Sequence, residues 1–294
     1  MKLHLIDGTY ELFRNHFGAP PRQASDGRQV GATLGLLRSL YALLSTSGVT
    51  HLGVAFDHVI ESFRNDLYPG YKTSAGVDPD LLAQFTLAEE AVSALGVVVW
   101  PMVEFEADDA LAAAVKRFGK LASVEQVVIC SPDKDLAQLV SGRRVVCWDR
   151  RREIVIDEAG VVEKFGVHPE SIPDWLALVG DAADGYPGIP GWGAKSASAV
   201  LFRYGHIESI PADPGKWKVQ SITPGRAARL AEALTSRSKE AALYRELATL
   251  RSDVPLKEKL RDLEWRGAFP RLQELCHNLG DDKLPARISR WRAS

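Results

Sequence analysis

Five short apolar runs, separated mostly by patterns typical of helices, constrain the fold more than any other feature of this sequence. They occupy residues 3–6 (LHLI), 52–56 (LGVAF), 97–99 (VVV), 127–130 (VVIC) and 144–148 (RVVCW). Such alternation predicts an α/β fold with a mainly parallel sheet. The runs VVCWD and EIVI, on either side of residues 150–152, predict a hairpin, and the pattern after residue 158 is helical with Pro and Gly breaks.

Composition indicates a soluble globular protein of one large or two modest domains. The 294 residues are 46% hydrophobic and 25% charged, which is ordinary for such proteins. No apolar run approaches the ~18 residues of a membrane span, and the first residues, MKLHLIDG, do not form an apolar leader. We therefore expect a cytoplasmic protein with no membrane partner. The three cysteines are far apart and odd in number, so reduced thiols are expected.

The charge is unevenly distributed along the chain. From residue 187 onward there are 19 Lys and Arg against 12 Asp and Glu, whereas the first 186 residues have 17 against 26. A basic C-terminal third suits a polyanionic partner, although solvated helix faces give the same excess.

Acidic residues follow three of the predicted strands directly. Asp7 follows the first run, Asp57 the second, and Asp133 and Asp135 come after the fourth. One such residue is commonly a turn residue or a helix N-cap. Three strands that are each followed by acidic residues indicate a ligand site, because ligands bind at the carboxyl edge of a parallel sheet.

A second acidic cluster opens a predicted helix in the stretch VEFEADDALAAAV. Glu106, Asp108 and Asp109 crowd the first turn. The helix dipole stabilises acidic residues there, but this effect accounts for a single acidic residue and does not require three. Three carboxylates repel one another unless a cation lies among them. Asp181 and Asp184 form a further pair in LVGDAADGYPG.

Together these positions make nine candidate metal ligands, all of which offer hard oxygen atoms. This donor set favours Mg²⁺ or Mn²⁺ over zinc, and an acidic pocket in an otherwise basic protein is typical of metal-dependent enzymes that act on nucleic-acid phosphates. The nine are Asp7, Asp57, Glu106, Asp108, Asp109, Asp133, Asp135, Asp181 and Asp184.

The stretch GIPGWGAKSAS, residues 188–198, predicts a phosphate-binding hairpin. Its small residues let backbone N–H groups approach a phosphate, and Lys195 lies at the start of the following helix. The nucleotide-binding P-loop does not fit, because Ala194 separates Gly193 from Lys195 and the preceding WLALVGD reads as helix. A plain structural turn remains the alternative.

Several stretches in order resemble the 5′-nuclease domain of bacterial DNA polymerase I and its flap-endonuclease relatives. They are LIDGTYELFR, VAFDHVIESFRNDLYPGYK, FEADDALA, CSPDKDLAQL and LVGDAADGYPGIPGWGAKSA, and LATLRSDVPL is similar to the family's closing segment. The resemblance implies a PIN-like α/β core over residues 1–172, with a helical arch. It also implies a helical C-terminal part, residues 173–294, that contains a DNA-binding helix-hairpin-helix motif at about 181–205.

The resemblance also implies roles for individual residues. Asp7, Asp57, Glu106, Asp108 and Asp109 would hold one metal ion, and Asp133, Asp135, Asp181 and Asp184 a second. Lys72, Arg64 and Arg14 match basic catalytic residues near the scissile phosphate. Tyr71 is either a stacking platform for an unpaired base or a core aromatic. The expected DNA contacts in the hairpin are Gly188, Gly191, Gly193, Lys195 and Ser196, with K⁺ as an expected ion of that motif.

The implied function is a 5′-3′ exonuclease or flap endonuclease that cleaves DNA by a two-metal-ion mechanism in replication and repair. Its partners would be 5′-flap, nicked or 5′-ended duplex DNA and a DNA polymerase, and it would act as a monomer. Two alternatives remain: a structure-specific DNA-binding protein with weak or no turnover, and a PIN-type ribonuclease.

The sequence departs from the family pattern at several positions. Three residues beyond Lys72, where polymerase-type members of the family have an arginine, this chain has Ala75. In addition, no Lys or Arg lies between Lys72 and Lys116, and these two features motivate the binding-protein alternative. Where the family usually has Asp-Asn, this chain has Asp184 and Gly185.

Overall fold

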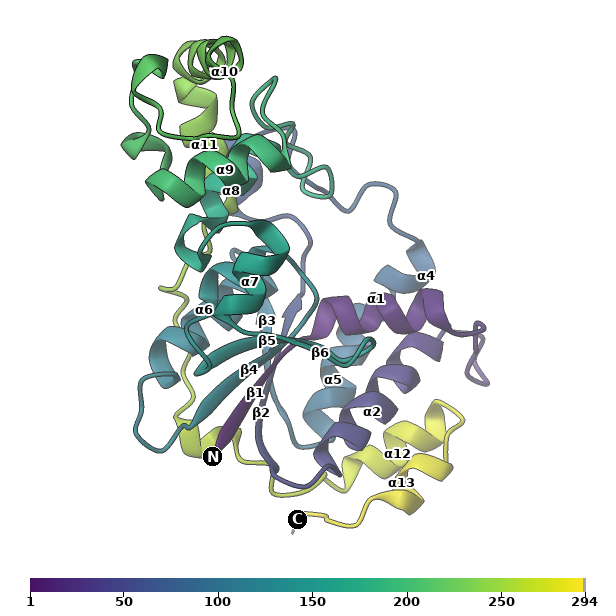
Figure 1. Cartoon of the computed structure of the whole chain (residues 1–294). Helices are drawn as coiled ribbons and strands as arrows, with labels where there is room; N and C mark the ends of the chain where they lie inside the picture. Colours follow the sequence, from purple (N-terminus) through teal and green to yellow (C-terminus); the bar gives the residue numbers. More distant parts are fainter. Residues whose placement is uncertain (293–294) are drawn as a thin grey trace. The chain divides into compact units, whose positions relative to one another are not determined.

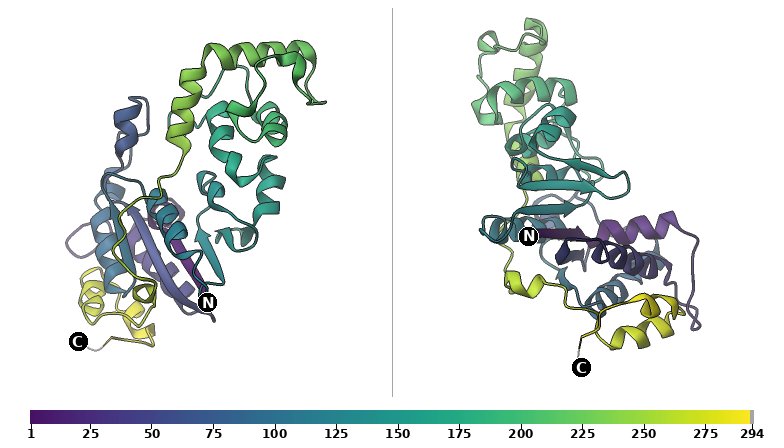
Figure 2. Two further views of the ribbon diagram at one scale, coloured as in Figure 1. Left: turned by 90° about the vertical axis from the view of Figure 1, so that its left-hand side faces the viewer. Right: turned by 60° about the horizontal axis from the view of Figure 1, so that its bottom comes forward.

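The computed structural model describes residues 1–292, which fold into two compact units (Figures 1 and 2). The first, here called the sheet unit, comprises residues 1–60, 74–131 and 251–292. The second, here called the helical unit, comprises Glu61–Thr73 and Pro132–Leu250. The two units are interleaved in the sequence. The division into residues 1–172 and 173–294 stays a prediction.

Four parallel strands form the centre of the sheet unit, in the order β3-β2-β1-β4. They are β1 (Lys2–Asp7), β2 (Val49–Asp57), β3 (Val98–Met102) and β4 (Gln126–Cys130). Leu5 of β1 lies opposite Gly53 of β2 and Ile129 of β4. The central strands are buried on both faces, as parallel sheets covered by helices are.

Strand order determines which face each helix covers. The chain passes from β1 to β2 and from β2 to β3 in the same direction across the sheet, but returns in the opposite direction to β4. Because such crossovers are right-handed, α1 (Gly8–Gly18), α2 (Gly31–Leu44) and α5 (Phe85–Ala94) lie on one face, and α6 (Ala107–Phe118) on the other (Figure 1). The connections diverge between β1 and β4, where ligand sites form in open sheets.

The remaining elements of the sheet unit are short. They are α4 (Pro79–Leu82), the 3₁₀ helix η5 (Leu260–Leu263), α12 (Arg271–Asn278) and α13 (Lys283–Arg287).

The helical unit contains an antiparallel strand pair and a set of helices. The strands are β5 (Val145–Asp149) and β6 (Ile154–Ile156), with Trp148 opposite Val155. The α-helices are α3 (Phe63–Leu67), α7 (Glu158–Phe165), α8 (Ile172–Val179), α9 (Ala194–Tyr204), α10 (Pro224–Ser236) and α11 (Ser238–Ala248). The 3₁₀ helices are η1 (Asp135–Leu139), η2 (Pro169–Ser171), η3 (Ile207–Ser209) and η4 (Pro214–Lys216). Helix α8 packs against both α9 and α11.

The predicted α/β class is confirmed, as are the five strands and the hairpin around residues 150–152. The predicted arch region, between β2 and α5, contains two short helices, α3 with five residues and α4 with four. No helix within residues 1–292 is long and apolar enough to cross a membrane.

Candidate active site

Asp7 ends β1 at the divergence point of the sheet. Its side chain caps α1, because Oδ1 accepts a hydrogen bond from the Tyr10 backbone N–H at 2.8 Å. Its Oδ2 accepts a second bond, at 3.0 Å, from the hydroxyl of Ser131, which directly follows β4. Asp7 is 6% exposed. The carboxylate is therefore held between the carboxyl ends of two neighbouring strands.

Asp57 ends β2, the neighbour of β1. Its Oδ1 accepts a hydrogen bond from the Ala107 N–H at 2.8 Å, and its own N–H donates to Thr9 Oγ1 at 2.8 Å. These two bonds connect the end of β2 to the first turns of α6 and α1. A half-buried carboxylate thus lies at the N-terminal end of α6.

The start of α6 brings Glu106 and Asp109 together, as their spacing predicted. Asp109 Oδ2 accepts a hydrogen bond from the Glu106 N–H at 3.0 Å, and Oδ1 accepts another from the Arg251 N–H at 2.8 Å. Asp109 is fully buried and Glu106 nearly so, whereas Asp108 is partly exposed. Both Asp109 oxygens accept backbone hydrogen bonds, so this residue supports the structure as well as being a candidate ligand.

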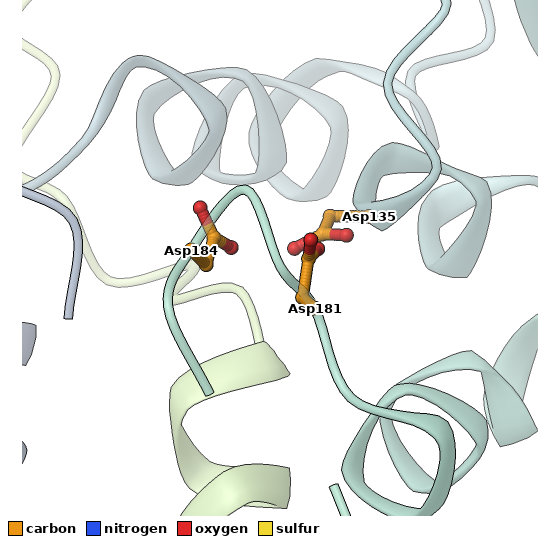
Figure 3. A group of neighbouring side chains, drawn as sticks. All are labelled: Asp135, Asp181 and Asp184. Atoms are coloured by element: carbon orange, nitrogen blue, oxygen red, sulfur yellow. The ribbon is translucent and has the colours of Figure 1, made fainter. Parts of the chain in front are cut away.

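Asp135, Asp181 and Asp184 form a second acidic group in the helical unit (Figure 3). Asp135 begins η1, and the other two lie in the loop that follows α8. One ligand oxygen from each lies within 4.8 Å of the others, and all three residues are buried. Asp133, the fourth predicted member, is exposed, and its Oδ1 accepts a hydrogen bond from the Asp135 N–H at 2.9 Å.

This second group crowds several carboxylates together in a buried place. Burial raises the pKa of Asp135 well above its usual value, and the charges of Asp133, Asp184 and Asp181 raise it further. Asp135 Oδ1 is buried without a hydrogen-bond partner among the described residues. An orphaned carboxylate oxygen beside two further carboxylates fits a divalent cation, whose preferred ligands are hard oxygens.

Two lysines contact the second acidic group. Lys72 Nζ lies 3.0 Å from Asp184 Oδ1, and Lys134 Nζ lies 2.5 Å from Asp181 Oδ2. Burial lowers the pKa of Lys134, but the hydrogen bond to Asp181 and the nearby carboxylate charges outweigh this, so the pKa is raised overall. Lys72 was predicted as a catalytic residue. Lys134 was not predicted, although its position between Asp133 and Asp135 in the sequence placed it beside the candidate ligands.

The backbone of Lys72 is held by two elements, the loop that contains Asp184 and helix α3. The Lys72 N–H donates to the Asp184 carbonyl at 3.0 Å, and its carbonyl accepts from Asn65 Nδ2 at 2.9 Å. Gly185 permits this contact: its φ is +89°, and a Cβ there would lie 2.1 Å from the Gly70 carbonyl oxygen. The departure from the family's usual Asp-Asn pair therefore has a steric reason in this chain.

Tyr186, in the same loop, is a buried residue that the sequence interpretation missed. Its ring stacks on that of Tyr244, with centroids 5.5 Å apart, and its hydroxyl has no hydrogen-bond partner among the described residues. Burial and the three carboxylates raise the pKa of this hydroxyl, so it stays protonated.

Three other predicted residues lie in structural positions. Arg64 is 1% exposed and donates to the carbonyls of Leu247, at 2.8 Å, and Thr249, at 3.2 Å, at the end of α11. Arg14 pairs with the Glu11 carboxylate on its own helix and also donates to Ser39. Tyr71 is 4% exposed, which supports the core-aromatic alternative for that residue. The catalytic roles of the two arginines stay predictions.

The predicted hairpin lies between α8 and α9, so the helix-hairpin-helix order is present. Gly191 has a φ of +84°, and a Cβ at Gly191 or at Gly193 would have open space around it. Lys195 is exposed in the first turn of α9. Ser196 instead turns inward, where its hydroxyl accepts from the Gly193 N–H at 3.1 Å. An accessible backbone and a nearby lysine suit a phosphate ligand.

Trp192 anchors this hairpin. The ring is 6% exposed, and its Nε1 donates to the Leu230 carbonyl of α10 at 3.1 Å.

Comparison with known proteins gives this architecture a class. A solved complex of bacteriophage T5 D15 flap endonuclease with DNA and metal ions superposes with a TM-score of 0.67 at 18% sequence identity. The match covers 96% of this chain and 100% of that one. The fold is thus that of the PIN-like 5′ nucleases.

Two family models match in succession: the 5′-3′ exonuclease N-terminal resolvase-like domain at residues 2–166 and the 5′-3′ exonuclease C-terminal SAM fold at residues 167–270. The chain is 36% identical over 263 residues to the 5′-3′ exonuclease of Aquifex aeolicus (strain VF5), a match that covers 89% of this chain and 88% of that protein. The chain belongs to the 5′-3′ exonuclease family.

The DNA polymerase I of Rhizobium leguminosarum is also 36% identical to this chain over 263 residues. That match covers 86% of this chain but 25% of the polymerase.

Proposed function

We propose that this protein hydrolyses DNA phosphodiester bonds near 5′ ends or at flap junctions, with Mg²⁺ or Mn²⁺ as cofactor. The buried Asp135, Asp181 and Asp184 group, with its orphaned oxygen and two lysines, carries the proposal. A group of this composition suits a divalent cation and phosphate chemistry more than any acid–base reaction between carboxylates alone.

The bound ions would supply charge stabilisation at the phosphate. We propose two of them, one held by each acidic group. Lys72 would pair with a phosphate oxygen once its ammonium leaves Asp184. The hairpin would hold the duplex through backbone N–H groups and Lys195, contacts that fix position without reading sequence. Arg64 would act as a positioning residue, because its guanidinium binds the end of α11.

A labelled 5′-flap duplex tests the proposal. We expect cleavage with Mg²⁺ or Mn²⁺ that leaves a 5′-phosphate, none in EDTA, and none with Asp135→Asn, which removes one carboxylate charge but keeps the side-chain shape. An RNA flap of the same sequence should be cut much more slowly. A flap left intact in both metals would refute the proposal, and preference for the RNA flap would favour a PIN-type ribonuclease.

A DNA-binding protein with weak turnover is the second candidate. Ala75 and the absence of Lys and Arg from residues 73–115 favour it, because a flap would meet no basic side chain there. Tight duplex binding without cleavage in either metal would identify this function.

A polymerase would act beside this protein in replication and repair, since the polymerase relatives contain a matching segment within a much longer chain. A cytoplasmic monomer and K⁺ at the hairpin stay predictions.

A further inference from the structure

Lys134 is neither one of the candidate metal ligands nor one of the proposed phosphate contacts, yet it lies beside the second acidic group. It immediately precedes η1, and its side chain reaches across to Asp181 in the loop after α8, 47 positions along the chain. The carboxylate it meets is 4% exposed, whereas the lysine side chain is 34% exposed. The ammonium thus covers the outer side of a buried carboxylate.

Two members of the second acidic group contact lysines, and the third has an unpartnered oxygen. Lys134 pairs with Asp181 and Lys72 pairs with Asp184. Asp135 keeps a buried oxygen without a partner among the described residues. The neighbouring carboxylates disfavour charge on one another in this buried place, and a divalent cation can offset that repulsion.

The ammonium and a divalent cation would compete for the Asp181 carboxylate. Asp181 is 4% exposed, so few directions remain from which a cation can reach it, and Lys134 already holds Oδ2. Lysine is a flexible point charge on a long stem, so the partly exposed side chain can move into solvent without a backbone shift.

We infer that Lys134 is a built-in counterion of the second acidic group, which a divalent cation displaces from Asp181 in order to bind. This inference rests on the proposed function only in taking the group to be a cation site. Lys134 offsets part of the negative charge of the group before the ion binds, and it lowers the affinity of the site for the ion. It is a positioning residue and does not contact the substrate.

Cation binding without DNA tests the inference. Mn²⁺ binding to the full chain is followed by electron paramagnetic resonance and calorimetry, and the step lost in Asp135→Asn is assigned to this group. We expect Lys134→Met to tighten that step about tenfold, equivalent to about 1.4 kcal/mol. Lys134→Arg, which keeps the charge, should stay within about twofold of the wild type. Lys164→Met removes an equivalent charge from the exposed surface of α7 and should change nothing.

Thermal unfolding supplies a second measurement. In EDTA, Lys134→Met should melt below the wild type, because the carboxylates have lost a counterion, and saturating Mn²⁺ should remove that difference. The wild type provides a third measurement, which does not depend on whether Lys134→Met folds. Its ¹³C-labelled lysine spectrum should show the Lys134 Cε signal, identified by its absence from Lys134→Arg, move towards the position of exposed lysines as Ca²⁺ is added.

The inference would be overturned by unchanged or weaker Mn²⁺ binding in Lys134→Met. It would also be overturned by a Lys134 Cε signal that does not move as Ca²⁺ is added. Weaker binding would instead mean that Lys134 positions Asp181 for the ion. Failure to cleave DNA would refute the proposed function but leave these measurements valid.

Discussion

Gly185→Ala separates the steric role of this glycine from its backbone conformation. The φ of +89° costs an alanine about 1–2 kcal/mol. The new Cβ would also lie 2.1 Å from the Gly70 carbonyl oxygen, and real contacts of this kind begin at 3.0 Å. The Gly70–Lys72 backbone must therefore move by about 1 Å, which weakens the bond from the Lys72 N–H to Asp184, a further loss of about 0.5–1.5 kcal/mol.

Gly27→Ala is the matched control. Gly27 has a φ of +84°, but a Cβ there would have nothing within 4 Å. Both variants incur the conformational cost, and Gly185→Ala alone displaces Lys72. We expect about 2–3 kcal/mol of destabilisation for Gly185→Ala and about 1–2 for Gly27→Ala in urea unfolding. Under the role proposed for Lys72, a displacement of about 1 Å can lower kcat by ~10²-fold.

The assay is flap cleavage at saturating DNA and Mn²⁺, which reports kcat for the folded fraction. If Gly185→Ala matched Gly27→Ala in both stability and kcat, the loop would have room for a side chain, and the steric explanation of this departure from the family pattern would be wrong. Gly185→Asn should relieve the φ cost but not the contact with Gly70, so it should restore stability in part and kcat very little.

Three further predictions concern single residues. Asp109→Ala should abolish flap cleavage and cost about 2–4 kcal/mol in urea unfolding, because two backbone N–H groups lose their acceptor; normal stability would contradict the bonding described here. Lys195→Glu should weaken binding to all duplex sequences equally and reduce the log–log salt slope by roughly 0.9 per lost phosphate contact; a salt titration in Ca²⁺ with an unchanged slope would make the hairpin a structural turn. Burial raises the pKa of Glu89 above its ordinary 4.5, although the hydrogen bond and charge of His58 oppose the shift. The folded protein then binds the Glu89 carboxyl proton more tightly than the unfolded chain does, so the contribution to stability is present below pH 4.5 and is lost as pH rises through the raised pKa. In urea unfolding from pH 4 to 7, the free energy of unfolding should decline less for Glu89→Gln than for the wild type. An equal dependence on pH in the two proteins would argue against this shift.

The relation between sequence and structure differs from residue to residue at the site. Asp7 and Asp57 could be placed from the sequence, because strand ends are local features and parallel strands share one edge. Glu106 and Asp109 could be paired by helix periodicity. Arg64 could not be placed, since its partners are carbonyl oxygens 183 and 185 residues away. The motif VAFDHVIESFRNDLYPGYK suggested that Arg64 contacts a phosphate, but the Arg64 side chain is almost entirely buried.

The sequence by itself determined the alternation of strands and helices, the acidic residues at the carboxyl edge and the glycine-rich hairpin. These follow from periodicity and from local backbone preferences, which a short stretch of chain encodes. The tertiary structure alone decided that Tyr71 is buried, that Lys72 and Lys134 pair with Asp184 and Asp181, and that Gly185 must lack a side chain. The lysine pairings span 112 and 47 positions, and Gly185 meets Gly70 across 115. Such contacts depend on how distant segments pack, which no local pattern specifies.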